Sequence, residues 1–141
     1  MSSCLFCRIK ERELSARIVF EDANAVAFLD HRPLFPGHTL LIPREHYEVL
    51  GDLPPDLVDP LFKDAQLLSR AIETAMQAEG TYVAMNNRVS QSVTHLHVHI
   101  VPRRRKDGLK GFFWPRQKYK NEEEIGLVAE AIERAIHDLR G

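Results

Sequence analysis

Apolar and polar residues follow two different periods along the chain. Short runs rich in β-branched and aromatic residues, bounded by Asp, Asn, Pro and Gly, predict β-strands. These runs cover residues 17–21, 25–30, 38–43, 81–86 and about 94–101. The sequence EDAN between the first two runs predicts a hairpin turn, and RPLFPG at 32–37 predicts a loop.

Two longer stretches repeat apolar residues at the spacing of an amphipathic helix. The first extends from about residue 55 to residue 79, and Gly80 is expected to end it as a C-terminal cap. Its apolar positions are Leu57, Leu61, Ala65, Leu68, Ile72 and Met76. The second helix begins after Asn121, a favourable N-cap, and its apolar positions are Ile125, Val128, Ile132, Ile136 and Leu139. Hairpin-like strands followed by a long helix predict an α+β fold with an antiparallel sheet.

The 141 residues are enough to bury a core, and we expect a single domain over residues 1–141. Nineteen Lys and Arg against 20 Asp and Glu give a net charge of −1, which argues against a nucleic-acid coat or a membrane-surface protein. The N-terminal sequence has charges from Arg8 onward, and later apolar runs fall short of the roughly 18 residues of a membrane span. These features predict a cytoplasmic protein without a membrane partner.

The segment VTHLHVHIVPR, residues 93–103, places His95, His97 and His99 on alternate positions. On a strand these imidazoles share one face, and the apolar residues between them share the other. A half-exposed strand that tolerates polar residues is one interpretation. A second is that several imidazoles bind one catalytic metal ion, since positions two apart on a strand lie roughly 7 Å apart. The third is that one imidazole acts as a nucleophile or acid–base group that the others tune.

The only two cysteines, Cys4 and Cys7, occur in the sequence CLFC. This spacing is common in zinc sites, and His46 together with one histidine of the segment would complete a Cys₂His₂ set. The alternative is a pair of reduced thiols packed as small apolar side chains. In a reducing compartment, so short a pair indicates metal binding or redox chemistry in preference to a structural disulfide.

The sequence HLHVHIVPR resembles the signature of the histidine triad (HIT) family, in which three histidines alternate with apolar residues. QSV at 91–93, FLD at 28–30 and GHTLLIPREH at 37–46 are also similar to this family. The resemblance extends over residues 4–103, leaving a basic aromatic flap and a C-terminal helix at 104–141. It implies a five-stranded antiparallel sheet with one long helix packed on it, and a homodimer with a continuous ten-stranded sheet.

The resemblance also implies nucleotide chemistry. His97 would attack an α-phosphate and form a nucleotidyl-histidine intermediate, because neutral imidazole offers a lone pair near pH 7. His99 and His38 would hold its tautomer and contact phosphate oxygens. Ser92 would donate a hydrogen bond, and backbone N–H groups from Gln91 to Val93 would hold the non-bridging oxygens.

In a bacterial-type branch of the family, two cysteines and two histidines bind zinc. Transferred to this sequence, the ligands are Cys4, Cys7, His46 and His95. Four protein ligands leave no open coordination position, so the zinc would be structural.

The resemblance places base and ribose near a further group of residues. They are Leu14, Phe28, Leu29, Asp30 and His31, with Asn86 or Asn87 near the phosphate. Asp30 would accept hydrogen bonds from the ribose hydroxyls, or it caps a turn. Phe28 and Leu29 contact the base, or they belong to the core.

Residues 102–120 contain eight Lys or Arg and one acid, Asp107, together with Phe112, Phe113, Trp114 and Tyr119. One interpretation is a substrate-facing flap that attracts polyphosphate and stacks on a base. The other is a solvated basic loop anchored by its aromatic residues. The near-neutral charge of the whole chain makes nucleic acid the less favoured partner.

We therefore expect a hydrolase that acts on purine nucleoside phosphoramidates or dinucleoside polyphosphates and releases a nucleoside monophosphate. One alternative is a nucleotidyltransferase or phosphorylase that uses phosphate or a sugar phosphate as acceptor. The other is a nucleotide-binding scaffold with vestigial activity.

Overall fold

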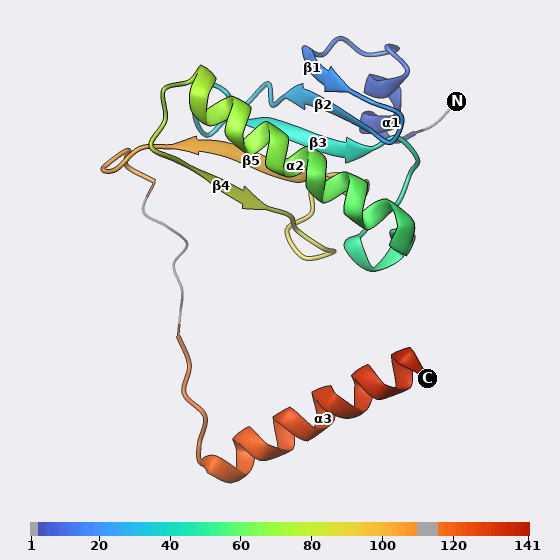
Figure 1. Cartoon of the computed structure of the whole chain (residues 1–141), viewed down its shortest axis with the longest axis vertical. Helices are drawn as coiled ribbons and strands as arrows, with labels where there is room; N and C mark the ends of the chain where they lie inside the picture. Colours follow the sequence, from blue (N-terminus) through green and yellow to red (C-terminus); the bar gives the residue numbers. More distant parts are fainter. Residues whose placement is uncertain (1–2, 110–115) are drawn as a thin grey trace. The chain divides into compact units, whose positions relative to one another are not determined.

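The computed structural model describes residues 3–109 and 116–141 (Figure 1). The chain divides into two compact units, Met1–Asp107 and Gly108–Gly141. The first unit contains the sheet and the helices around it. The second contains the C-terminal helix. The expectation of one domain over residues 1–141 stays a prediction.

The first unit is built on a five-stranded antiparallel sheet, as the sequence predicts. Its strands are β1 (Ile18–Glu21), β2 (Ala25–Leu29), β3 (Thr39–Pro43), β4 (Gly80–Ala84) and β5 (Val98–Arg103). Their order is β1-β2-β3-β5-β4, and every neighbouring pair is antiparallel. β5 begins only at Val98, so the predicted strand start near residue 94 is wrong, and His95 and His97 precede the strand.

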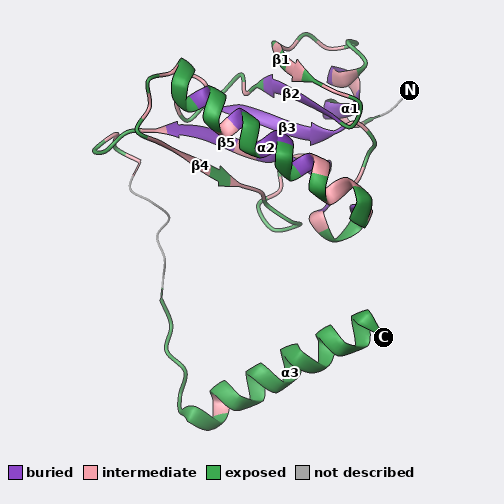
Figure 2. Ribbon diagram, in the orientation of Figure 1, coloured by how far each residue is buried: buried purple, intermediate pink, exposed green. Residues whose placement is uncertain are grey.

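Side chains of the sheet alternate between two apolar clusters, one on each face. Ala25, Ala27, Leu41, Val98 and Ile100 belong to the cluster beneath α2 (Pro55–Ala75). The other cluster contains the intervening residues of β2 and β3 together with Phe6 and Ile9 of α1 (Leu5–Lys10). α2 and α1 therefore cover opposite faces, and β2, β3 and β5 are buried between them (Figure 2).

The predicted hairpin turn between β1 and β2 is confirmed. The Oδ1 atom of Asp22 accepts hydrogen bonds from the backbone N–H groups of Asn24 and Ala25, both at 2.8 Å. This Asx-type turn satisfies two backbone donors and reverses the chain.

The predicted end of α2 is wrong, because the helix stops at Ala75 and Gly80 is the first residue of β4. Gln77 has a φ of 51°, in the left-handed region. The Ala78 N–H donates to the Glu73 carbonyl at 2.9 Å, and the Gln77 N–H donates to the Thr74 carbonyl at 3.2 Å. This is a Schellman motif in which Gln77 occupies the position usually given to glycine, so the sequence carried little signal for it.

Two short elements were not predicted: α1 and the 3₁₀ helix η1 (Leu50–Asp52). α3 (Glu122–Arg140) begins where the sequence predicts, and Asn121 Oδ1 accepts a hydrogen bond from the Glu124 N–H at 2.8 Å. Its apolar stripe is exposed along the helix. Among the described helices, none is long and apolar enough to cross a membrane.

A pair of carboxyl groups joins the β1–β2 turn to α2. Asp64 is 9% exposed, and its Oδ2 atom has no hydrogen-bond partner among the described residues. Burial raises the pKa of Asp64 to about 7, and a hydrogen bond and charge repulsion from Asp22 act in the same direction. Arg44 lies beside this pair, and its Nε–H donates to the Asp22 backbone carbonyl at 2.6 Å. One of the two carboxyls therefore holds a proton near neutral pH.

We expect Asp64→Asn to remove a pH-dependent loss of stability. The pKa of Asp64 in the folded protein, about 7, exceeds the unfolded value of about 3.9, so the stability that its proton contributes is present below about pH 4 and is lost as pH rises from about 4 to about 7. Asparagine keeps the shape and cannot ionise. Urea unfolding at pH 5 and pH 8 should show a loss smaller by at least about 1 kcal/mol than in wild type, because one pKa unit corresponds to about 1.4 kcal/mol. Equal pH dependence in the two proteins would refute the shared proton.

Candidate active site and metal centre

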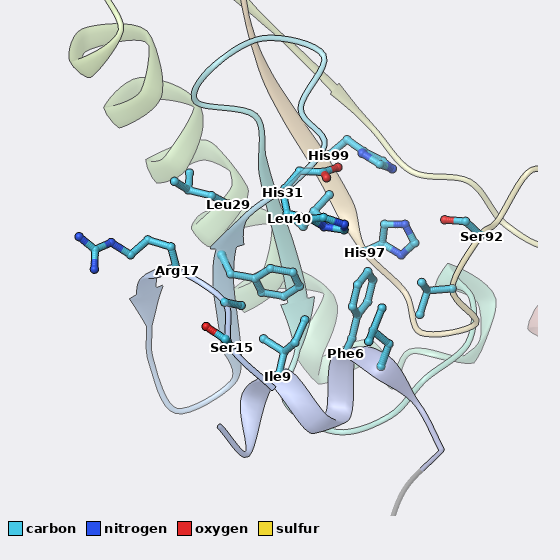
Figure 3. A pocket seen from close by; sticks show the side chains of 15 residues that line it. Phe6, Ile9, Ser15, Arg17, Leu29, His31, Leu40, Ser92, His97 and His99 are labelled. Carbon is cyan, nitrogen blue, oxygen red and sulfur yellow. The ribbon is translucent and has the colours of Figure 1, made fainter. Parts of the chain in front are cut away.

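The histidine segment separates its side chains as the alternation predicts, even though it precedes β5. Leu96, Val98 and Ile100 are fully buried in the cluster beneath α2. His97 and His99 line a cavity of about 430 Å³ on the other face (Figure 3). The apolar residues thus anchor the segment, and two imidazoles of the triad face a site of ligand size.

The tautomer of His97 follows from its hydrogen bond to the chain. Its Nδ1 atom lies 2.7 Å from the backbone carbonyl of His95, which can only accept, so Nδ1 carries the proton and Nε2 keeps its lone pair. Burial lowers the pKa of His97 below its ordinary value, although this hydrogen bond and the charge of Asp30 oppose the shift. A neutral imidazole with a free Nε2 lone pair is the form that can act as a nucleophile.

A second chain of hydrogen bonds fixes His99. The Leu34 N–H donates to His38 Nδ1 at 3.1 Å, so the neutral His38 ring carries its proton on Nε2. That Nε2–H donates to His99 Nδ1 at 2.9 Å, which leaves the His99 proton on Nε2. Burial lowers the pKa of both rings, that of His99 to about 4. The His97 ring, with its Nε2 lone pair, and the His99 ring, which offers an Nε2–H donor, are thus neighbours with centroids 5.0 Å apart.

His95 faces a different site, formed with Cys4, Cys7 and His46. Its Nε2–H donates to the Pro43 carbonyl at 3.0 Å, so the lone pair is on Nδ1, and burial lowers the pKa of His95 to about 4. Both cysteine Sγ atoms lie 3.5 Å from this Nδ1, and His46 Nδ1 lies 3.4 Å from Cys7 Sγ. The four ligand atoms all lie within 4.8 Å of one another.

These distances fit a tetrahedral zinc ion. With Zn–S bonds of about 2.3 Å and Zn–N bonds of about 2.0–2.1 Å, a tetrahedral angle separates S from N by about 3.5 Å. The observed separations of 3.4 and 3.5 Å agree with this value. The two cysteines reach the site because Cys4 caps α1 and Cys7 lies three positions later, on the same side of the helix.

The structure brings most of the predicted nucleotide-binding residues to the cavity. Phe28, Leu29, Asp30, His31, Ser92 and Val93 all line it. Asp30 Oδ2 lies 3.7 Å from His38 Nε2, and its Oδ1 accepts a hydrogen bond from the Arg32 N–H at 2.9 Å. Asp30 thus also caps a turn, one of the two roles considered for it.

Four other predicted residues are not among those that line the cavity. Leu14 packs against the cluster beneath α1. Asn87 Oδ1 accepts a hydrogen bond from the Leu50 N–H at 2.8 Å, and Asn86 is exposed. Gln91 accepts a hydrogen bond from the Arg88 N–H and donates one to the Glu48 carbonyl. Asn87 and Gln91 therefore connect the loop before the triad to the η1 region.

Sequence reasoning missed the part of the cavity that α1 and the following loop supply. Leu5, Phe6 and Ile9 of α1 line it, as do Ser15, Ala16, Arg17 and Leu40. The signal was present in CLFCRI, where two apolar residues separate the two cysteines and a third follows them. Six residues are too few for a helical period to stand out.

The described part of the basic segment is held by its own ion pairs and hydrogen bonds. Arg103 pairs with Asp107 at 2.6 Å and Arg105 pairs with Glu79 at 2.6 Å, while Arg104 donates to the Met76 carbonyl. Phe112, Phe113 and Trp114 lie outside the described residues, so the aromatic half of the predicted flap stays a prediction.

The fold and the two histidine-lined sites define a class of protein, and comparison with known proteins identifies its family. The HIT domain matches residues 11–106. An adenylylsulfatase from Arabidopsis thaliana is 34% identical over 98% of this chain and 72% of its own length. An adenosine 5′-monophosphoramidase from Saccharomyces cerevisiae is 34% identical over 83% of this chain and 73% of its own length.

A solved structure agrees with these matches. A zinc-bound histidine triad family protein from Mycobacterium smegmatis has a TM-score of 0.72 and 35% identity, covering 96% of this chain and 97% of its own. The chain therefore belongs to the HIT family, as the sequence predicts, and its relatives include named hydrolases.

We expect the imidazole of His99 to be neutral at pH 6 and the pKa of His97 to lie below that of a free histidine. Burial lowers the pKa of both below the ordinary value of about 6.5, that of His99 to about 4. NMR titration of the ring C–H signals, assigned with His97→Ala and His99→Ala, measures this. An unstructured histidine peptide serves as the control, and a midpoint at or above 6.5 for His97 would contradict the lowering of its pKa by burial.

Proposed function

We propose that the protein is a nucleotide hydrolase that works through a covalent nucleotidyl intermediate on His97. Its substrates would be purine nucleoside phosphoramidates or dinucleoside polyphosphates, and its product a nucleoside monophosphate. The observation that carries the proposal is the fixed tautomer of His97, with a free Nε2 lone pair in a cavity of mononucleotide size. The names of the two hydrolase relatives support a substrate that carries an adenylyl group and reacts at its α-phosphate.

The first step forms a bond between Nε2 of His97 and the α-phosphorus while the bond to the leaving group breaks. The leaving group departs with that electron pair, and Ser92, which lines the cavity, is placed to donate a hydrogen bond to it. The imidazole becomes cationic, so its Nδ1–H bond to the His95 carbonyl, 2.7 Å in the free protein, strengthens. An interaction that strengthens as charge develops lowers the barrier.

The second step returns the enzyme to its starting state. Water attacks the phosphorus and releases a proton to the solvent, the bond from phosphorus to Nε2 breaks, and its electron pair returns to the imidazole. The Nε2–H of His99 is the donor available to the phosphoryl oxygens in both steps. Because His38 holds this tautomer, the donor needs no reorganisation during the reaction.

The rest of the cavity suits a nucleoside. Phe6, Ile9, Phe28 and Leu40 give it an apolar wall for a base. Asp30, at the same cavity, offers a carboxylate that can accept hydrogen bonds from ribose hydroxyls. Its volume of about 430 Å³ lies within the usual range for small-molecule sites.

One feature favours a second candidate, nucleotidyl transfer. A polar hollow of about 570 Å³ shares Leu5, Ser92 and Val93 with the cavity. It is also lined by Ser3, Glu48 and Thr94 and by Cys4 and His46 of the metal centre. It offers room for an acceptor other than water. A nucleoside diphosphate formed in the presence of inorganic phosphate would identify phosphorolysis.

We expect His97→Ala to lower kcat by at least about a thousandfold, because it removes the nucleophile. The substrates are an adenosine phosphoramidate and a diadenosine polyphosphate, and the product is measured as AMP. Wild type denatured under alkaline conditions, in which a phosphorus–nitrogen bond survives, should carry adenylate on that bond, and His97→Ala should carry none. Glu123→Ala, on the exposed first turn of α3, is the control. Full activity of His97→Ala would refute the covalent route.

We also propose that Cys4, Cys7, His46 and His95 hold a structural zinc ion. When bound, it supplies a cross-link between α1 and the histidine segment. The donor set, the 3.4–3.5 Å separations and the zinc-bound relative support this assignment. Two reduced cysteines used as metal ligands also agree with a cytoplasmic location.

Purified wild type should contain about one equivalent of zinc, and Cys4→Ala less than half. Because the metal binds only the folded chain, its loss should lower the Tm by at least about 5 °C. Ser3→Ala, at the neighbouring exposed position, is the matched control and should keep both values. Equal zinc content and Tm in Cys4→Ala would rule out the site.

A homodimer agrees with the exposed edge of the sheet. β4 is the last strand in the order β1-β2-β3-β5-β4, and its Val83 is 42% exposed. Phe62 and Leu67 on α2 are 41% and 51% exposed. We propose that a second copy pairs with β4 and covers these residues, which would join two sheets into one of ten strands.

A further inference from the structure

α1 belongs to both sites at once. Cys4 caps the helix and Cys7 lies within it, and both cysteines face the metal centre. Leu5, Phe6 and Ile9, from the same six residues, line the nucleotide cavity. The helix is therefore a shared wall, and its position matters to whatever binds on either side.

Phe6 is the residue of this wall that contacts the nucleophile. Its ring centroid lies 4.9 Å from that of His97, with the two planes at 86°. The same ring lies 6.2 Å from His95 and 5.3 Å from Phe28. Phe6 thus packs between a metal ligand, the imidazole of His97 and the apolar side of the cavity, and only 5% of it is exposed. Figure 3 shows Phe6 beside His97 at the cavity.

The second neighbour of the nucleophile also belongs to the metal centre. The carbonyl that accepts the His97 Nδ1–H bond is that of His95. The His95 ring is held on one side by the Pro43 carbonyl and faces both cysteines on the other. Metal ligation would therefore fix two neighbours of His97. One is the ring of Phe6, which packs against it, and the other is the His95 carbonyl, which orients it.

A helix as short as α1 needs such support. A six-residue helix in water is unstable alone, because its nucleation cost is not recovered over so few residues. Burial of Phe6 and Ile9 supplies part of its stability, and the two metal-facing cysteines at its start would supply more. A nucleotide also requires the helix in place, since α1 forms its wall. Two ligands that need the same ordered element bind with positive cooperativity.

We propose that metal at the Cys₂His₂ centre and nucleotide in the cavity bind cooperatively through α1, with Phe6 as the positioning residue that transmits the effect to His97. This inference rests on the proposed function, because it takes the cavity to be a nucleotide site. It adds that metal occupancy sets nucleotide affinity and that nucleotide sets metal affinity.

The test measures the coupling from both directions in the full-length protein. The Zn²⁺ affinity is determined by competition with a chelator, with and without saturating AMP. The AMP affinity is then determined at two zinc activities set by the chelator. We expect each ligand to raise the affinity for the other by the same factor, about fivefold or more. A factor of one in both directions would overturn the coupling.

Phe6→Leu tests the residue itself, because it keeps an apolar side chain and removes the ring. Both ligands should still bind, with the coupling factor reduced towards one. Phe6→Met is the second variant if Phe6→Leu does not fold. Leu68→Ala, in the cluster beneath α2, is the matched control for destabilisation and should keep the wild-type factor.

The outcomes separate the two proposals. An unchanged coupling factor in the Phe6 variants would overturn the role of Phe6. AMP binding that is equally tight at both zinc activities would refute the cooperativity and leave the proposed function intact. Failure of AMP to bind zinc-loaded wild type would refute the proposed function, and the cooperativity with it.

Discussion

The chemistry of this protein depends on a hydrogen bond between two residues of the same short segment. The His95 carbonyl accepts the Nδ1 proton of His97 at 2.7 Å and thereby decides which nitrogen of the ring is reactive. Imidazole tautomers differ little in energy in water, so a fixed acceptor is needed to choose one. Burial then keeps the ring neutral. The remaining groups of the site, His99 with His38 behind it, lie beside a proposed nucleophile whose tautomer is already set.

A hydrogen bond fixes the tautomer of each of the three triad histidines, and the protonated nitrogen is not the same in all of them. His97 is protonated on Nδ1, while His95 is protonated on Nε2 by its bond to the Pro43 carbonyl. His99 is also protonated on Nε2, because His38 donates to its Nδ1. The ring of His97 thus keeps a lone pair on Nε2 towards the cavity, that of His95 keeps one on Nδ1 towards the cysteines, and that of His99 offers an Nε2–H donor. These are the forms that the proposed nucleophile, metal ligand and phosphate donor each require.

Much of this arrangement could be predicted from the sequence, and the failures have physical causes. Alternation of His with Leu and Val predicts the two faces, because the apolar residues must enter the core wherever the strand itself begins. The role of Phe6 escaped prediction, since it depends on a six-residue helix stabilised by its surroundings. The end of α2 was misplaced for a local reason. Gln77 adopts a left-handed conformation, for which the sequence pattern expects glycine.

The late start of β5 has a consequence for how the site could arise. Within a sheet, backbone carbonyls are committed to neighbouring strands, and a ladder extended through residue 95 would compete for the group that holds His97. The chain instead leaves regular pairing for a few residues, with the Leu96 N–H bound to the Tyr47 carbonyl at 2.7 Å. The irregular backbone just before β5 therefore leaves the His95 carbonyl available to accept the Nδ1–H bond of His97. The group that sets the tautomer of His97 exists because regular strand pairing stops short of it.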